Sequence, residues 1–280
     1  MKKFGIVITL VLVVQLAYSQ QAIIVEKSGA GTVLLFLPGF TTPGTVWNET
    51  IENLDGDYES HIVSYAGFNG LSPIEFPWYE TVKKELIAYI KKEKLSDVTL
   101  IGHSMGGNLA VDVAVALPGQ IKGLILLESI PCMLEVMMPG VPASALQYDT
   151  PYNNQMLEMS EEDFIKMAQA SAQNMTNDPS KAALITEWTV HSDRKSYVYG
   201  YTDLLKLDLR EKLIDIEIPT LIIACSLPDR EVVSANLEKQ FRNLKQKEIL
   251  LVDDSKHFVM FDQPEWLYTQ INKYLRSNVR

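Results

Sequence analysis

The sequence is poor in the residues that build crosslinks and metal sites. Its 280 residues include two cysteines and four histidines. Two cysteines cannot form a disulfide scaffold, and four histidines leave little room for a histidine-rich metal site. A chain of this length buries enough surface to fold without a crosslink or a metal. We therefore expect no metal and no other cofactor.

Basic residues are also scarce, and they form no cluster. The formal net charge is −10 at pH 7, so the chain is a poor candidate for binding nucleic acid or an anionic membrane surface. Hydrophobic residues make up 47% of the chain and charged residues 21%. These values are typical of a soluble globular protein, and they exclude a disordered chain, a collagen-like repeat or a bundle of membrane spans.

The apolar run near the N-terminus is too short to span a membrane. Phe4–Val14 would form roughly 17 Å of helix, against a hydrocarbon core of about 30 Å. Lys2 and Lys3 precede this run, and Ala17–Ser19 supplies small residues before a cleavage point at Gln20. This order predicts a secretory signal peptide at residues 1–19, and therefore a secreted or periplasmic protein with no stable membrane insertion after cleavage.

Short apolar runs alternate with helical patterns along the rest of the chain. Helices are expected at 78–94, 105–117 and 232–241 and at the C-terminus. Strands are expected at 22–25, 32–37, 62–65, 98–101, 121–127, 218–225 and 248–252. Strands that alternate with helices predict an α/β fold, with a mostly parallel central sheet and helices on both faces.

One stretch, residues 131–209, interrupts this alternation. It shows no convincing strand and holds seven of the ten methionines. We interpret it as a helical cap inserted between two strands, with the core formed by residues 20–130 and 210–280. A methionine-rich cap suits an apolar, adaptable pocket, although methionines also fill ordinary helix packing.

The strongest chemical signal is the motif Gly102-His103-Ser104-Met105-Gly106-Gly107. It lies between an expected strand and an expected helix, where a serine must turn sharply. Glycines two residues before and two residues after remove side chains that would collide. The serine oxygen is then presented at the edge of the sheet and at a helix N-terminus. The context predicts that Ser104 is a nucleophile.

A serine nucleophile needs an acid and a histidine, and candidates for both follow Ser104 in that order. His257 lies beyond the strand at 248–252 and can act as general base. Asp229 follows the strand at 218–225 and is the preferred acid for orienting the imidazole. Glu128, at the end of the preceding strand, remains a rival. The amides of Met105 and Phe40 are the expected donors to an oxyanion.

These motifs resemble those of the α/β-hydrolase superfamily, specifically its cap-bearing serine hydrolases. The resemblance covers nearly all of residues 22–275: Leu37–Phe40 resembles the oxyanion loop, residues 218–223 the strand before the acid, and residues 257–264 the histidine loop. The loop at 225–229 is a residue longer than the common pattern, which keeps Glu128 as an alternative acid. The family's strand order also places Cys132 near Cys225, where a disulfide could form.

The resemblance implies hydrolysis of a small or medium carboxylic ester through an acyl-enzyme. Lactones, thioesters, amides and peptides are chemically compatible, and so is a non-catalytic receptor that binds a small ligand in the same pocket. The oligomeric state stays open. From position alone, the expected pocket residues, besides Phe40, are Trp78, Met133, Met137 and Met138.

Overall fold

The computed structural model describes residues 21–279. The predicted signal peptide at 1–19 lies outside the described residues. Among the residues that are described, no helix is both long and apolar enough to cross a membrane.

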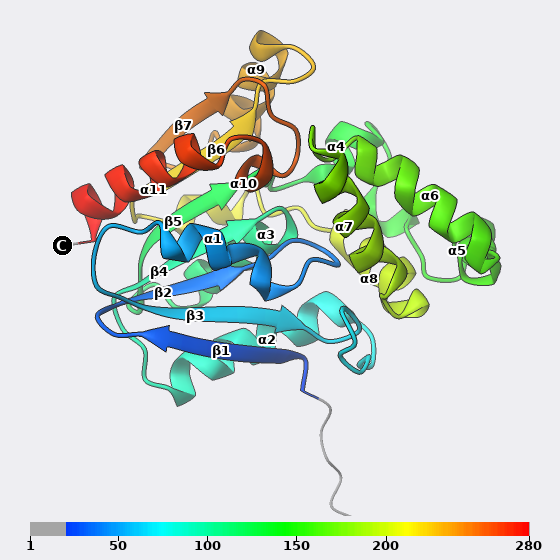
Figure 1. The fold of residues 1–280 in the computed structure, drawn as a ribbon, viewed down its shortest axis with the longest axis horizontal. Helices are drawn as coiled ribbons and strands as arrows, with labels where there is room; N and C mark the ends of the chain where they lie inside the picture. The colour runs from blue at the N-terminus through cyan, green and yellow to red at the C-terminus, as the bar shows by residue number, and fades with distance from the viewer. Residues whose placement is uncertain (1–20, 280) are drawn as a thin grey trace, which may run out of the picture.

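A seven-stranded sheet forms the centre of the molecule (Figure 1). Its strand order is β1-β3-β2-β4-β5-β6-β7; β1 pairs antiparallel with β3, and every other pair is parallel. The predicted mostly parallel sheet is therefore confirmed. The strands are β1 (Ile23–Gly29), β2 (Thr32–Leu37), β3 (Tyr58–Tyr65), β4 (Val98–His103), β5 (Ile121–Leu127), β6 (Thr220–Cys225) and β7 (Lys247–Val252).

Helices cover both faces of this sheet. One face packs against α2 (Trp78–Lys92), α3 (Met105–Ala116) and α9 (Arg230–Gln240), and the other against α1 (Asn48–Glu52) and α11 (Pro264–Asn278). Side chains of β2 alternate between these two cores, because successive residues of a strand point to opposite faces. All six residues of β4 are buried, so the strand that precedes Ser104 lies at the centre of the fold.

Between β5 and β6, residues 128–219 form helices and no strand. Figure 1 shows these helices gathered at one side of the molecule, next to the carboxyl end of β3. They are α4 (Met133–Met137), α5 (Pro151–Glu158), α6 (Glu161–Gln173), α7 (Pro179–Val190) and α8 (Arg194–Leu205). Short 3₁₀ turns lie at Gly44–Trp47, Ala143–Ala145 and Lys212–Asp215, and α10 (Val259–Asp262) precedes α11.

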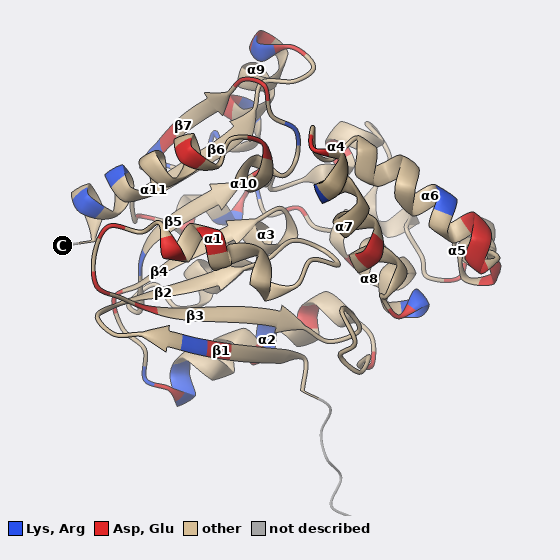
Figure 2. Ribbon diagram, in the orientation of Figure 1, with Lys and Arg blue, Asp and Glu red and all other residues tan. Residues whose placement is uncertain are grey.

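The four longer helices of this insertion each begin at a capping side chain. Thr150, Ser160, Asp178 and Asp193 accept hydrogen bonds from backbone amides in the first turns of α5, α6, α7 and α8. Such caps satisfy amides that the helix itself leaves unpaired. Acidic and basic residues are spread over both the core and the insertion (Figure 2).

Candidate active site

Ser104 occupies a sharp turn between β4 and α3. Its φ of 53° and ψ of −122° fall in a region that side chains rarely adopt. A Cβ on Gly102 would lie 2.4 Å from the carbonyl oxygen of Gly106, and a Cβ on Gly106 would lie 2.1 Å from that of Leu37. Glycine is therefore required at both positions, which matches the steric reasoning from the sequence.

Glu128, rather than Asp229, lies next to His257. The distance from His257 Nδ1 to Glu128 Oε2 is 3.5 Å. Because Nδ1 faces the carboxylate, Nε2 is the ring nitrogen left for a proton from a serine hydroxyl. Catalytic hydrogen bonds are often long before a substrate binds, so this spacing is compatible with an orienting acid.

Asp229 has a structural task instead. It is exposed, and its carboxylate caps α9 by accepting a hydrogen bond from the amide of Val232 at 2.9 Å. Among the described residues, Asp229 forms no ion pair with His257. The expected pairing of Asp229 with the imidazole is thus not what the structure shows. The loop after β6 places Asp229 at the N-cap of α9 and not beside His257.

The Glu128 carboxylate is held by the end of β6. Its own backbone has a φ of 49°, and its amide donates to the carbonyl of Ile223 at 2.8 Å. The Cys225 amide donates to Glu128 Oε1, and the Cys225 thiol lies 3.7 Å from Oε2. Burial, together with the nearby Glu128 charge, raises the pKa of the Cys225 thiol to about 11, so the thiol keeps its proton and can donate it.

Both expected oxyanion donors are available. Phe40 follows β2, and Met105 is the first residue of α3. Within the described part of the chain, neither amide has a hydrogen-bond acceptor. The first amides of a helix have no partner inside the helix, so Met105 is free by geometry.

His103 fastens the histidine loop to the nucleophile turn. Its buried ring donates from Nε2 to the carbonyl of His257 at 2.8 Å, and its Nδ1 has no hydrogen-bond partner. Burial lowers the pKa of His103 well below its usual range, so the ring is neutral. The insertion also holds this loop, because the Phe258 amide donates to the carbonyl of Met175 at 2.9 Å.

Ser104 and His257 line two adjoining cavities. The inner cavity, of about 300 Å³, lies beneath the insertion and is lined by Phe40, Met133, Met175, Tyr197 and Phe258, among others. The outer cavity, of about 320 Å³, lies between α4 and α9.

The pocket residues expected from position divide between these cavities and other places. Phe40 lines the inner cavity and Met133 lines both. Trp78 is fully buried beneath Phe40, and its indole donates to the Ala66 carbonyl. Met137 and Met138 line neither cavity, and Met137 is 54% exposed. The structure therefore places Trp78, Met137 and Met138 outside both cavities, contrary to the prediction that they line the pocket.

Sequence reasoning missed Tyr197 and Tyr201, which line the inner cavity from α8 and pack on Phe40. Their spacing of four residues puts them on one helix face, which is the signal that could have found them. Burial raises the pKa of Tyr197 to about 12, so its hydroxyl stays neutral.

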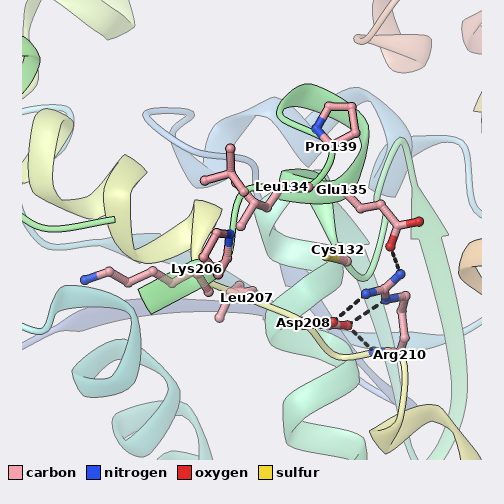
Figure 3. A pocket seen from close by; sticks show the side chains of 12 residues that line it. Cys132, Leu134, Glu135, Pro139, Lys206, Leu207, Asp208 and Arg210 are labelled. Atoms are coloured by element: carbon pink, nitrogen blue, oxygen red, sulfur yellow. Dashed lines mark hydrogen bonds and ion pairs between the residues drawn. The ribbon is translucent and has the colours of Figure 1, made fainter. Parts of the chain in front are cut away.

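A third cavity, of about 380 Å³, lies on the other side of α4 and does not include Ser104 or His257 (Figure 3). Cys132, Asp208 and Arg210 line it. Both cysteines are free, so the disulfide suggested by family strand order is not formed. Cys132 and Cys225 instead contact different polar groups: Cys132 pairs through its backbone with Gln240, and Cys225 contacts Glu128.

Comparison with known proteins gives one consistent result. The model of the "Alpha/beta hydrolase family" matches residues 34–270. The chain belongs to the alpha/beta hydrolase family. Fold and family membership together make it a hydrolase, as the sequence predicted.

The relatives are esterases by name. A pimeloyl-[acyl-carrier protein] methyl ester esterase from Wigglesworthia glossinidia brevipalpis is 26% identical, covering 88% of this chain and 94% of its own length. The Legionella pneumophila enzyme of the same name is also 26% identical, over 90% and 98%. Among solved structures, an esterase from Exiguobacterium antarcticum has a TM-score of 0.75 at 19% identity, over 91% and 95% of the two chains, and supports the fold.

We expect Gly106→Ala to destabilise the protein. The new methyl group would collide with the carbonyl oxygen of Leu37, a backbone atom that cannot turn away. The free energy of unfolding, measured in urea, should fall by about 2–4 kcal/mol. Gly119→Ala is the matched control, because a Cβ there meets nothing within 4 Å, and it should change stability by less than about 1 kcal/mol. Equal effects of the two substitutions would contradict the steric account.

The buried neutral His103 predicts a pH dependence of stability. Its folded-state pKa is depressed, so its contribution is complete above about pH 6.5 and is lost as the pH falls below that value, where the unfolded chain takes up a proton. His103→Gln keeps a donor but does not titrate. Between pH 7.5 and 5, the variant should lose less stability than the wild type, by as much as about 2 kcal/mol. Urea unfolding at both pH values tests this, and parallel losses would refute it.

Proposed function

We propose that this hydrolase is a serine esterase that cleaves a carboxylic ester through an acyl-enzyme. The observation that carries the proposal is the meeting of three features around the two cavities that Ser104 and His257 both line: the strained Ser104, the His257–Glu128 pair at 3.5 Å, and the amides of Phe40 and Met105, which have no acceptor among the described residues. The names of the relatives support an ester rather than an amide as the substrate class.

In the first half-reaction, Ser104 Oγ attacks the ester carbonyl carbon while His257 Nε2 takes the hydroxyl proton. The carbonyl oxygen becomes negatively charged, and the amides of Phe40 and Met105 donate to it. The bond from carbonyl carbon to alkoxy oxygen then breaks. His257 gives its proton to the departing alcohol, and the acyl group stays on Ser104.

In the second half-reaction, water attacks the acyl carbon. His257 removes a proton from this water and returns it to Ser104 Oγ as the acyl–serine bond breaks, which releases the carboxylic acid. The Glu128 carboxylate accepts a hydrogen bond from Nδ1 of His257, which keeps the ring in the useful tautomer, and it stabilises the imidazolium that forms twice per cycle.

Turnover of p-nitrophenyl esters, from acetyl to long acyl chains, tests the proposal. Ser104→Ala should lower kcat by at least about 10³-fold, because the nucleophile is lost while the fold is kept. Ser277→Ala, an exposed serine in α11, should leave kcat unchanged. Hydrolysis at the wild-type rate by Ser104→Ala would refute the serine mechanism. If the wild type shows neither turnover nor labelling of Ser104 by a fluorophosphonate probe, the ligand-binding alternative is favoured.

A matched pair of carboxylate-to-amide substitutions identifies the acid. Glu128→Gln should lower kcat by about 10²–10⁴-fold, because an amide neither holds the useful tautomer nor stabilises imidazolium. Asp229→Asn should stay within about twofold of the wild type, since asparagine also caps helices well. The reverse order of these two effects would restore Asp229 as the acid.

A further inference from the structure

Two cavities meet at Ser104, and the same few side chains separate them. Ser104, His257, Met133 and Leu204 line both. Ser104 and His257 belong to the reacting centre. Met133 from α4 and Leu204 from α8 therefore form the partition between the two spaces, directly beside the serine.

The inner cavity has no charged Lys, Arg, Asp or Glu in its lining and is the more enclosed of the two. None of its lining residues is exposed. Its walls combine aromatic and aliphatic side chains with hydroxyl groups such as those of Ser171 and Tyr197. A group that enters this space must be uncharged and must fit within about 300 Å³.

The outer cavity is lined mainly by apolar side chains and opens to solvent. Val136 on α4 and Leu227 after β6 line it, and each is 47% exposed. Farther in, the lining continues with Ile130, Val233 and Leu237. The charged side chain in its lining, Glu128, is already paired with His257 and Cys225. Because the cavity opens to solvent, it restricts the width of a bound group more than the length of that group.

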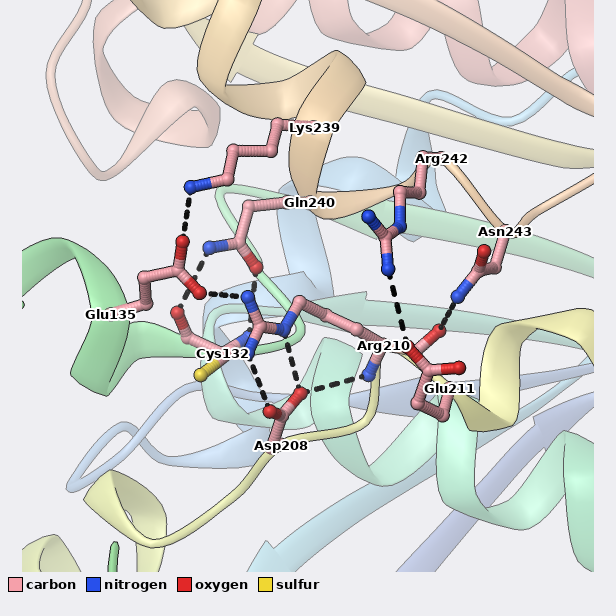
Figure 4. A network of polar contacts seen from close by, with 9 residues as sticks. All are labelled: Cys132, Glu135, Asp208, Arg210, Glu211, Lys239, Gln240, Arg242 and Asn243. Atoms are coloured by element: carbon pink, nitrogen blue, oxygen red, sulfur yellow. Dashed lines mark hydrogen bonds and ion pairs between the residues drawn. The ribbon is translucent and has the colours of Figure 1, made fainter. Parts of the chain in front are cut away.

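The walls of the outer cavity are tied together (Figure 4). Glu135 of α4 forms ion pairs with Lys239 of α9 and with Arg210. The Cys132 backbone exchanges two hydrogen bonds, each 3.1 Å long, with the side chain of Gln240. These contacts hold α4 against α9, so that Val136 and Met133 keep their places on the cavity wall.

We infer that the two cavities divide the substrate: the inner one binds the smaller, uncharged group of the ester, and the outer one binds a longer apolar chain that passes between Val136 and Leu227 to solvent. This inference rests on the proposed esterase function. It names the substrate class as an ester with one compact group and one extended apolar chain, and it makes Met133 and Leu204 the residues that keep the two apart.

Narrowing the mouth of the outer cavity tests the inference. Two ester series are compared, p-nitrophenyl esters of increasing acyl length and acetates of increasing alcohol length. Val136→Trp and Leu227→Trp narrow the mouth from opposite walls. Each should lower the ratio of kcat/KM for the longest over the shortest ester by about tenfold in one series, because two or three methylenes lose their apolar contacts. The series that responds identifies the group that the outer cavity binds.

Val232→Trp is the matched control. Val232 on α9 is the neighbour of Val233, is 64% exposed and lines neither cavity, so the ratio should not change. Ser171→Phe, which narrows the inner cavity, should lower kcat/KM for bulky groups in the other series.

The outcomes separate the two proposals. Ester hydrolysis with an unaltered ratio in both Val136→Trp and Leu227→Trp overturns the division of the substrate but leaves the esterase proposal intact. An equal fall in Val232→Trp overturns it as well, because that change acts outside both cavities. A wild-type protein that hydrolyses neither series and whose Ser104 takes no fluorophosphonate label overturns both proposals.

Discussion

The close approach of Gly106 to the carbonyl oxygen of Leu37 is the contact on which the site depends. It presses the start of α3 against the end of β2, where any side chain at Gly106 would collide. Met105 immediately precedes Gly106 in the sequence, and Phe40 lies three residues after Leu37. The same contact therefore brings the two segments that carry these amides close to Ser104. One steric constraint thus positions Ser104 and the expected oxyanion donors together.

The fold and the strained turn at Ser104 were readable from the sequence because both follow from local patterns. Alternating apolar runs predicted a mostly parallel sheet, and glycines around Ser104 predicted its turn. The carboxylate beside His257 was harder to predict, since Asp229 and Glu128 both lie near the carboxyl end of a strand. The choice depends on how the loop after β6 folds, and there the capping of α9 takes up Asp229. Whether Asp229 caps α9 or pairs with His257 depends on tertiary structure, which leaves no periodic pattern in the sequence.

The pocket was predicted least well, because proximity in sequence does not settle which face of a short helix points inward. Met133, Met137 and Met138 lie within six residues, yet Met133 alone among them lines the cavities. Tyr197 and Tyr201 approach the same space from a helix some sixty residues later in the chain. Only the packing of α8 on Phe40 brings them there.

The placement of Glu128 at the end of β5 has a consequence for how such a protein can change over time. The carboxylate beside His257 comes from Glu128 at the end of β5. The exposed tip of the loop after β6, at Leu227, therefore does not have to supply a charged residue to the imidazole. Leu227 in that loop forms part of the outer cavity instead. Insertions or replacements at the tip can alter which substrates fit without moving the reacting groups. In this loop, residues that line the outer cavity can therefore vary separately from the carboxylate beside His257.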